Sequence, residues 1–137
     1  NYNDRWSEKY PEINLNSSGT FREALANCKI FVCDSIQTVW LESLFVNKPT
    51  VMYLDFDKYS FTGNGAHYLD KLKSVSILHN SPEKAADTIN NVHGDIEEWW
   101  NDPTLQRVRE EFCDNYARKS KNSIEEYAQE LKSLYNT

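Results

Sequence analysis

The residues best placed to do chemistry form a polar run, Asp34 to Thr38, that follows a short apolar segment. Ser35, Gln37 and Thr38 carry hydrogen-bond donors, and Asp34 adds a carboxylate. Glu42 follows Thr38 by four positions, so on a helix the two side chains share a face. Donors at a helix N-terminus suit a phosphate, and a carboxylate one turn later can accept hydrogen bonds from a sugar or ribose hydroxyl. We therefore take these five residues as candidate site residues for a phosphorylated ligand.

Each of these residues also has a purely structural explanation. Asp34 and Ser35 are good helix N-caps, and their side chains would then be used in local hydrogen bonds. Glu42 has two such explanations, an exposed helix face or an ion pair with Arg22 or Lys48. The residue pattern alone leaves the structural and the functional interpretation open.

Several other kinds of function are disfavoured by the composition. The chain has four glycines, too few for a glycine-rich phosphate loop, and its three cysteines lack zinc-type spacing. Asp55 and Asp57 have the D-x-D form that can hold a divalent metal, but this pattern is common by chance, so we expect no metal site. The net charge of −6 argues against a nucleic-acid partner. The longest apolar runs are far shorter than the ~20 residues of a transmembrane helix, so no transmembrane segment is expected.

A strand–helix–strand unit positions the candidate residues. The apolar run 29–33 predicts a buried strand, residues 37–46 predict a helix that is apolar nearly all round, and residues 50–54 predict a second buried strand. Strands joined by a helical crossover are parallel. The polar run therefore lies at the carboxyl ends of the strands, where ligands bind in open α/β sheets.

The segments around this unit are predicted from weaker patterns. Residues 1–19 indicate an irregular leading segment, and a capping box then begins a helix over 20–28. Residues 55–68 read as a long loop, followed by a short helix over 68–73. Residues 74–78 alternate in part and predict a third strand.

Helices are predicted for the rest of the chain. Two of them are amphipathic and must bury their apolar stripes, so we expect the C-terminal helices to pack back on the body rather than extend as a tail. Trp99, Phe112 and Tyr116 should be largely buried, and the last helix, 123–135, should be the more exposed one. The predicted fold is therefore α/β, a small parallel sheet flanked by helices with a C-terminal helical stretch.

The stretch from Lys29 to Tyr116 resembles the C-terminal part of a group of bacterial surface-carbohydrate transferases. The most specific piece is the pattern T-x-x-L-E-x-L-x-x-N-x-P-T from Thr38 to Thr50. Two further pieces are SILHNSPEKAADTIN and DIEEWWNDPTLQRVREEFCDNYAR. These proteins resemble GT-B-type glycosyltransferases and, more distantly, CDP-glycerol glycerophosphotransferases.

The resemblance implies a function for the whole chain, 1–137. The chain would be one Rossmann-like domain, the C-terminal half of a longer GT-B-type transferase in surface-polysaccharide biosynthesis, and would bind a nucleotide-activated sugar or polyol donor without a further cofactor. Ser35, Gln37 and Thr38 would approach the donor phosphates, and Glu42 would meet the sugar or ribose. The N-terminal half of the same enzyme would be the partner and would supply the catalytic base, so the piece alone would be inactive.

Two further expectations accompany this interpretation. The location is cytoplasmic, with a peripheral position on the inner face of the membrane left open. The alternative function is a non-catalytic α/β interaction or regulatory module, which would have no nucleotide ligand.

Overall fold

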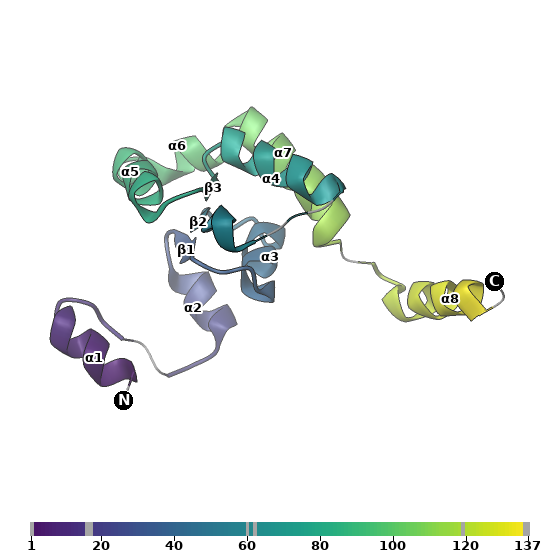
Figure 1. Cartoon of the computed structure of the whole chain (residues 1–137), viewed down its shortest axis with the longest axis horizontal. Coiled ribbons are helices and arrows are strands. Elements are labelled where there is room, and N and C mark those ends of the chain that lie inside the picture. The colour runs from purple at the N-terminus through teal and green to yellow at the C-terminus, as the bar shows by residue number, and fades with distance from the viewer. Residues whose placement is uncertain (1, 16–17, 60, 62, 119, 136–137) are drawn as a thin grey trace.

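The computed structural model describes residues 2–15, 18–59, 61, 63–118 and 120–135, and its centre is a parallel β-sheet (Figure 1). Three strands form this sheet in the described part of the chain, in the order β1-β2-β3. They are β1 (Phe31–Cys33), β2 (Thr50–Tyr53) and β3 (Leu78–His79). In the parallel register Cys33 lies opposite Met52, and Tyr53 lies opposite His79.

Helices surround the sheet on both sides. Figure 1 shows α5 on one side of the strands and α3, α4 and α7 on the other. Within the described residues there are eight α-helices and one 3-10 helix, η1: α1 (Tyr2–Lys9), α2 (Phe21–Asn27), α3 (Thr38–Phe45), η1 (Phe56–Lys58), α4 (Asn64–Ser74), α5 (Pro82–Val92), α6 (Ile96–Trp100), α7 (Pro103–Tyr116) and α8 (Ser123–Tyr135).

The predicted strand–helix–strand unit is confirmed as β1, α3 and β2. Strand β2 is covered, with Val51 and Met52 fully buried, whereas β1 is covered only in part, because Cys33 is buried and Val32 is 46% exposed. The helix is apolar nearly all round, and it is covered by the sheet and by α7. The α/β class and the parallel sheet are therefore as predicted, and the segment from Asp34 to Gln37 joins the carboxyl end of β1 to α3.

The core lies where α3, α4, α6 and α7 meet the sheet. It consists of Cys33, Trp40, Leu44, Met52, Leu54, Leu69, Leu72, Ile77, Leu78, Trp100, Leu105, Val108, Phe112 and Cys113. The core also contains a buried cation, Arg109 on α7, whose exposed fraction is 7%. Its Nη1 donates a hydrogen bond to the backbone oxygen of Leu44, at 3.0 Å. The same oxygen accepts from the Asn47 amide at 3.1 Å, so Arg109 adds a second hydrogen bond to a carbonyl in the last turn of α3.

Several residues of the sequence pattern from Thr38 to Thr50 have structural roles in or near the turn between α3 and β2. Asn47 has a φ of 57°, a left-handed conformation that asparagine tolerates better than most residues. The indole nitrogen of Trp100 donates to Oδ1 of Asn47 at 2.8 Å, which ties α6 to this turn. Inside the turn, Thr50 Oγ1 lies 3.1 Å from Ser43 Oγ, and both side chains are fully buried. These positions of the pattern are structural.

Two predictions for the flanking segments are wrong. Residues 1–19 were expected to be irregular, but α1 covers Tyr2–Lys9. The apolar periodicity of this stretch is too weak for a helix to be predicted from it. The predicted loop 55–68 is shorter than expected, because α4 begins at Asn64. Gly63, with a φ of 62°, turns the chain immediately before that helix.

The third strand exists but is displaced. It was predicted at 74–78 and is observed at Leu78–His79. The earlier residues form the C-terminal turn of α4, where the Ile77 amide donates to the Leu72 oxygen at 3.1 Å. Ser76 has a φ of 61°, which is incompatible with an extended strand.

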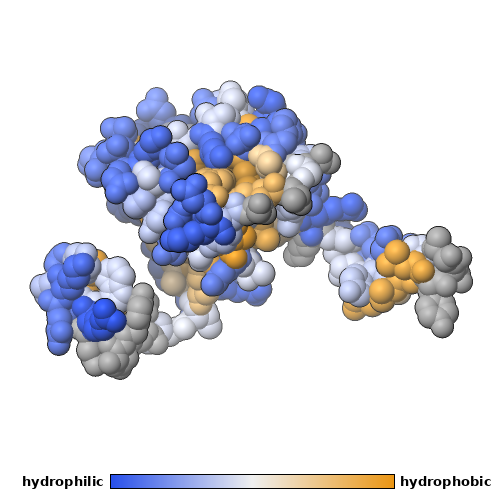
Figure 2. Space-filling view, in the orientation of Figure 1, coloured by the Kyte–Doolittle hydropathy of each residue, from blue (hydrophilic) through white to orange (hydrophobic). Residues whose placement is uncertain are grey.

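The two C-terminal helices behave differently from each other. Phe112 on α7 is 3% exposed and Trp99 packs partly buried against the core, as predicted, but Tyr116 is 43% exposed at the end of α7. Helix α8 stands away from the body (Figure 1), so the expectation that it packs back is wrong, whereas its greater exposure is confirmed. Its apolar stripe faces solvent, visible as an orange side in Figure 2: Ile124, Tyr127, Leu131 and Leu134.

Candidate functional site

A cleft of about 440 Å³ lies beside the N-terminus of α3. Its walls come from five parts of the chain: the segment before α3, α3 itself, the region that leads into α4, α4 itself, and α7. The lining residues are Ile36, Gln37, Thr38, Trp40, Leu41, Phe61, Gly65, Leu69, Phe112 and Tyr116. The walls are mostly apolar, and the polar side chains Gln37 and Thr38 lie where α3 begins. Figure 2 shows hydrophobic side chains gathered on this part of the body.

The N-terminus of α3 carries no side-chain cap. Gln37 is the N-cap residue, and its side chain makes no capping hydrogen bond. Two other helices are capped in the usual way, α5 by Ser81 and α7 by Asp102. The structural interpretation of Asp34 and Ser35 as caps of α3 is therefore wrong. Among the described residues no side chain caps the first amides of α3, and the dipole is positive at this end of the helix, so this end suits an anion.

The structure brings some of the predicted site residues together. Gln37 and Thr38 both line the cleft. Thr38 also lines an adjoining hollow of about 530 Å³ on the other side of Leu41, and Glu42 lines that hollow with it. Thr38 thus links Gln37 on one side to Glu42 on the other, consistent with the predicted shared helix face.

Two predicted residues are not part of the cleft lining. Asp34 is exposed, and Ser35 is half-buried. The backbone oxygen of Ser35 accepts from Cys33 Sγ at 3.1 Å and from the Gln37 amide at 3.2 Å. These bonds shape the short connection between β1 and α3. Asp34 and Ser35 therefore lie next to the cleft without lining it.

Glu42 forms an ion pair with Arg22, as its structural interpretation predicts. Its Oε2 lies 3.9 Å from Nε of Arg22. The Glu42 side chain is 45% exposed and the Arg22 side chain is 87% exposed. An exposed pair at this distance contributes little to stability. The ion pair with Arg22 therefore leaves the Glu42 carboxylate available to a ligand in the hollow.

Several lining residues could not be recognised from local sequence. Phe61, Gly65 and Tyr116 come from segments far apart in the chain, and a side chain at Gly65 would begin 3.8 Å from the Tyr116 hydroxyl. Trp40 belongs to the α3 pattern, but its apolar surroundings suggested only packing. Its indole Nε1 is buried and has no hydrogen-bond partner among the described residues.

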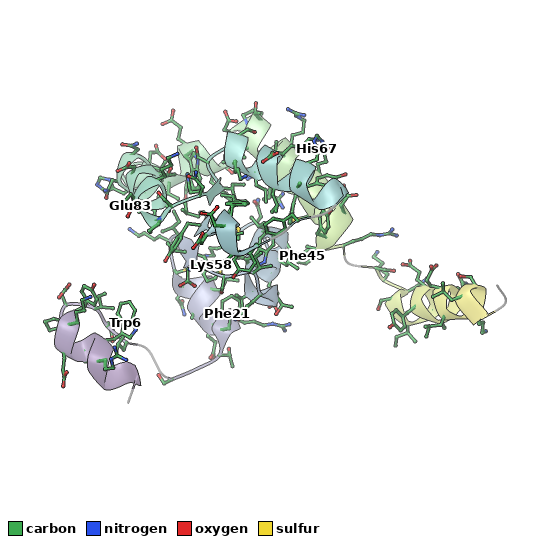
Figure 3. All side chains as sticks on the ribbon, viewed as in Figure 1. Trp6, Phe21, Phe45, Lys58, His67 and Glu83 are labelled. Carbon is green, nitrogen blue, oxygen red and sulfur yellow. The ribbon has the colours of Figure 1, made fainter. Side chains whose placement is uncertain are left out.

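The carboxyl ends of β1 and β2 are acidic. Burial raises the pKa of Tyr53, at the end of β2, and the nearby Asp34 carboxylate raises it further. Asp55 pairs with Lys58 at 2.8 Å, and this bond holds the pKa of Asp55 below its usual range. Figure 3 labels Lys58 on η1. Asp55 Oδ1 also accepts from the Asp57 amide at 3.2 Å. One carboxylate of the D-x-D pattern is thus used to form the turn.

The described residues form neither a metal-binding cluster nor a membrane-spanning helix. No group of three or more His, Cys, Asp or Glu side chains there is placed to hold a metal ion. None of the helices described is both long and apolar enough to cross a bilayer.

The described chain is therefore an α/β protein with a parallel sheet, and its cleft lies beside the carboxyl end of β1, the edge at which such sheets commonly bind ligands. Residues 1–131 match the sequence profile of a family described as LIC12162 family transferase, so the chain belongs to this family of transferases. The transferase character implied by the sequence resemblance is thereby confirmed. No curated protein and no solved structure matches the chain significantly.

Proposed function

We propose that this chain is the donor-binding domain of a GT-B-type transferase that takes a nucleotide-activated unit and transfers it to a surface-polysaccharide precursor. The observation that carries the proposal is the uncapped N-terminus of α3, which opens at the cleft with Gln37 and Thr38 beside it. Membership of a transferase family supports it. So does the resemblance of the Thr38 to Thr50 pattern to surface-carbohydrate transferases.

Four of the five candidate residues have a role in this proposal, and Asp34 has none. The first amides of α3, with Gln37 and Thr38, bind donor phosphate, and Ser35 supports the turn that presents them. Glu42 accepts hydrogen bonds from the ribose or the transferred sugar. The catalytic base belongs to an N-terminal half of the enzyme, and the Rossmann-like chain alone binds the donor without turning it over. We place this activity in the cytoplasm, where nucleotide-activated donors are made.

Calorimetric titration with nucleoside mono- and diphosphates tests the proposal. We expect one nucleotide to bind, and the double variant Thr38→Val with Glu42→Gln to weaken its binding at least tenfold while the circular dichroism spectrum stays unchanged. A nucleotide at 100 times its dissociation constant should also stabilise the fold by about 2.7 kcal/mol.

The matched control is Thr104→Val with Glu97→Gln, which makes the same chemical changes at exposed positions of α7 and α6. The control should bind as the wild type does. If no nucleotide binds, or if both double variants bind equally well, the donor-binding function is wrong and a non-catalytic interaction module becomes the better explanation.

A further inference from the structure

The cleft and its surroundings have an unusual charge for a site that binds phosphate. Among the described residues that line the cleft there is no lysine, arginine or histidine, and the polar side chains Gln37 and Thr38 are uncharged. Sites for a diphosphate commonly place cationic side chains or a divalent metal on it. The side chains that line the described cleft supply neither.

The sheet edge next to the cleft makes a second phosphate still less favourable. Asp34, Asp55 and Asp57 follow β1 and β2 at their carboxyl ends. The nearest cation there along the chain, Lys58, is paired with Asp55 at 2.8 Å. The carboxylates of Asp34 and Asp57 therefore leave this edge negative, and a phosphate that extends toward it is repelled.

The adjoining hollow does not compensate for the negative charge of this sheet edge. Arg118 and Glu42 both line it, so its two charged side chains are of opposite sign. Arg118 also lies 3.9 Å from Glu126 at the start of α8. The hollow therefore offers hydrogen-bonding groups to an uncharged sugar and little net attraction to an anion.

The groups that remain suit one phosphate joined to an apolar, flat group. The N-terminus of α3 acts as about half a positive charge and offers free amides. Trp40, which lines the cleft and is only 5% exposed, brings no charge there, and its indole N–H is buried without a partner among the described residues. The aromatic walls and a volume of about 440 Å³ are sufficient for a nucleobase with its ribose.

From this charge distribution we infer that the donor is activated through a single phosphate, as a sugar ester of a nucleoside monophosphate, an inference that rests on the proposed function. In the transfer, the acceptor hydroxyl oxygen forms a bond to the anomeric carbon while the bond from that carbon to the phosphate oxygen breaks. The acceptor proton goes to the base, and the nucleoside monophosphate leaves with the bonding electron pair. A polyol-phosphate donor is disfavoured, because activation by a nucleotide gives it two phosphates.

Paired titrations of the whole chain test this inference. For each base, the nucleoside monophosphate and diphosphate are titrated by calorimetry, once with EDTA and once with Mg²⁺. For the base that binds, we expect the monophosphate to bind at least tenfold more tightly than the diphosphate under both conditions. A diphosphate that binds equally or more tightly, with or without Mg²⁺, overturns the inference and leaves donor binding intact. Absence of binding by every nucleotide overturns the proposed function itself.

A variant that adds a charge independently tests whether the charge of the cleft sets the preference for a monophosphate. Gln37→Lys places a cation at the cleft, so it should improve diphosphate binding more than monophosphate binding and reduce the monophosphate preference at least threefold. Gln129→Lys adds the same charge on α8, away from the cleft, and should leave the preference unchanged. An unchanged preference in Gln37→Lys, with both nucleotides still bound, would show that charge does not set the selectivity.

Discussion

His79 shows how burial of a single side chain can make the stability of this fold depend on pH. It lies half-buried at the end of β3, and Nε2 is 3.0 Å from the Ser76 oxygen. Burial lowers the pKa of His79, and the nearby Lys84 lowers it further, whereas the contact with Ser76 acts in the opposite direction. Folding therefore favours the neutral imidazole.

The consequence is a loss of stability in mild acid. Below the ordinary histidine pKa of about 6.5, the unfolded chain binds a proton that the folded chain still excludes, so the free energy of unfolding falls as pH falls. We expect urea unfolding to show this decline between about pH 7 and 5, and His79→Gln to reduce it. His93→Gln, at the exposed end of α5, is the control. An equal decline in wild type and His79→Gln would rule out His79 as the cause.

At the scale of the elements, one side chain joins α7 to α3. Arg109 donates to the Leu44 oxygen from a buried position, so Arg109→Ala removes the charged hydrogen bond that joins α7 to α3 and leaves that carbonyl with the Asn47 amide as its other donor. We expect a loss of roughly 1 to 3 kcal/mol in the free energy of unfolding, measured by denaturant titration. Arg107→Ala removes an exposed arginine from the same helix and should cost much less. Equal losses in the two variants would contradict the role of Arg109.

Helices α7 and α8 differ in how much of their apolar surface is covered. Because α7 is packed in the core and the stripe of α8 faces solvent, amide hydrogen exchange should be slow across 104–117 and fast across 124–135. The opposite order, with α8 the more protected helix, would contradict the arrangement described above.

The elements also show which parts of the fold could be predicted from sequence. β1, α3 and β2 were predictable because each is a continuous apolar run bounded by polar residues or proline. β3 was displaced because alternation in residues 74–78 imitates a strand, whereas the chain there forms the end of a helix. The site was predicted only in part: Gln37 and Thr38 adjoin a strand end, but Phe61 and Tyr116 reach the cleft through tertiary packing, which local patterns do not encode.

At the scale of the whole molecule, α1 and α8 lie at opposite ends, and the body between them contains the sheet and the cleft (Figure 1). The proposed ligand therefore binds to the body. There the Asp55 carboxylate of the D-x-D pattern is occupied by Lys58 and by the Asp57 amide. The fold thus uses one carboxylate of this pair in a turn.

We accordingly expect nucleotide binding by the chain to be independent of divalent metal. EDTA should leave the calorimetric dissociation constant unchanged within a factor of about two, and so should Asp55→Asn combined with Asp57→Asn. Loss of binding both in EDTA and in this double variant would show instead that the pair holds a metal on the donor. The matched control is Asp87→Asn, on α5.

The buried indole of Trp40 gives the cleft a natural optical reporter. The chain has four tryptophans, and Trp40 both lines the cleft and packs against Phe112 with ring centroids 5.1 Å apart. A ligand that enters changes the polarity around this ring, so intrinsic fluorescence should shift on binding. Trp40→Phe should abolish the shift and Trp6→Phe, on α1, should retain it. A shift that persists in Trp40→Phe would place the bound ligand elsewhere, so the emission spectrum alone can locate the ligand before any complex is crystallised.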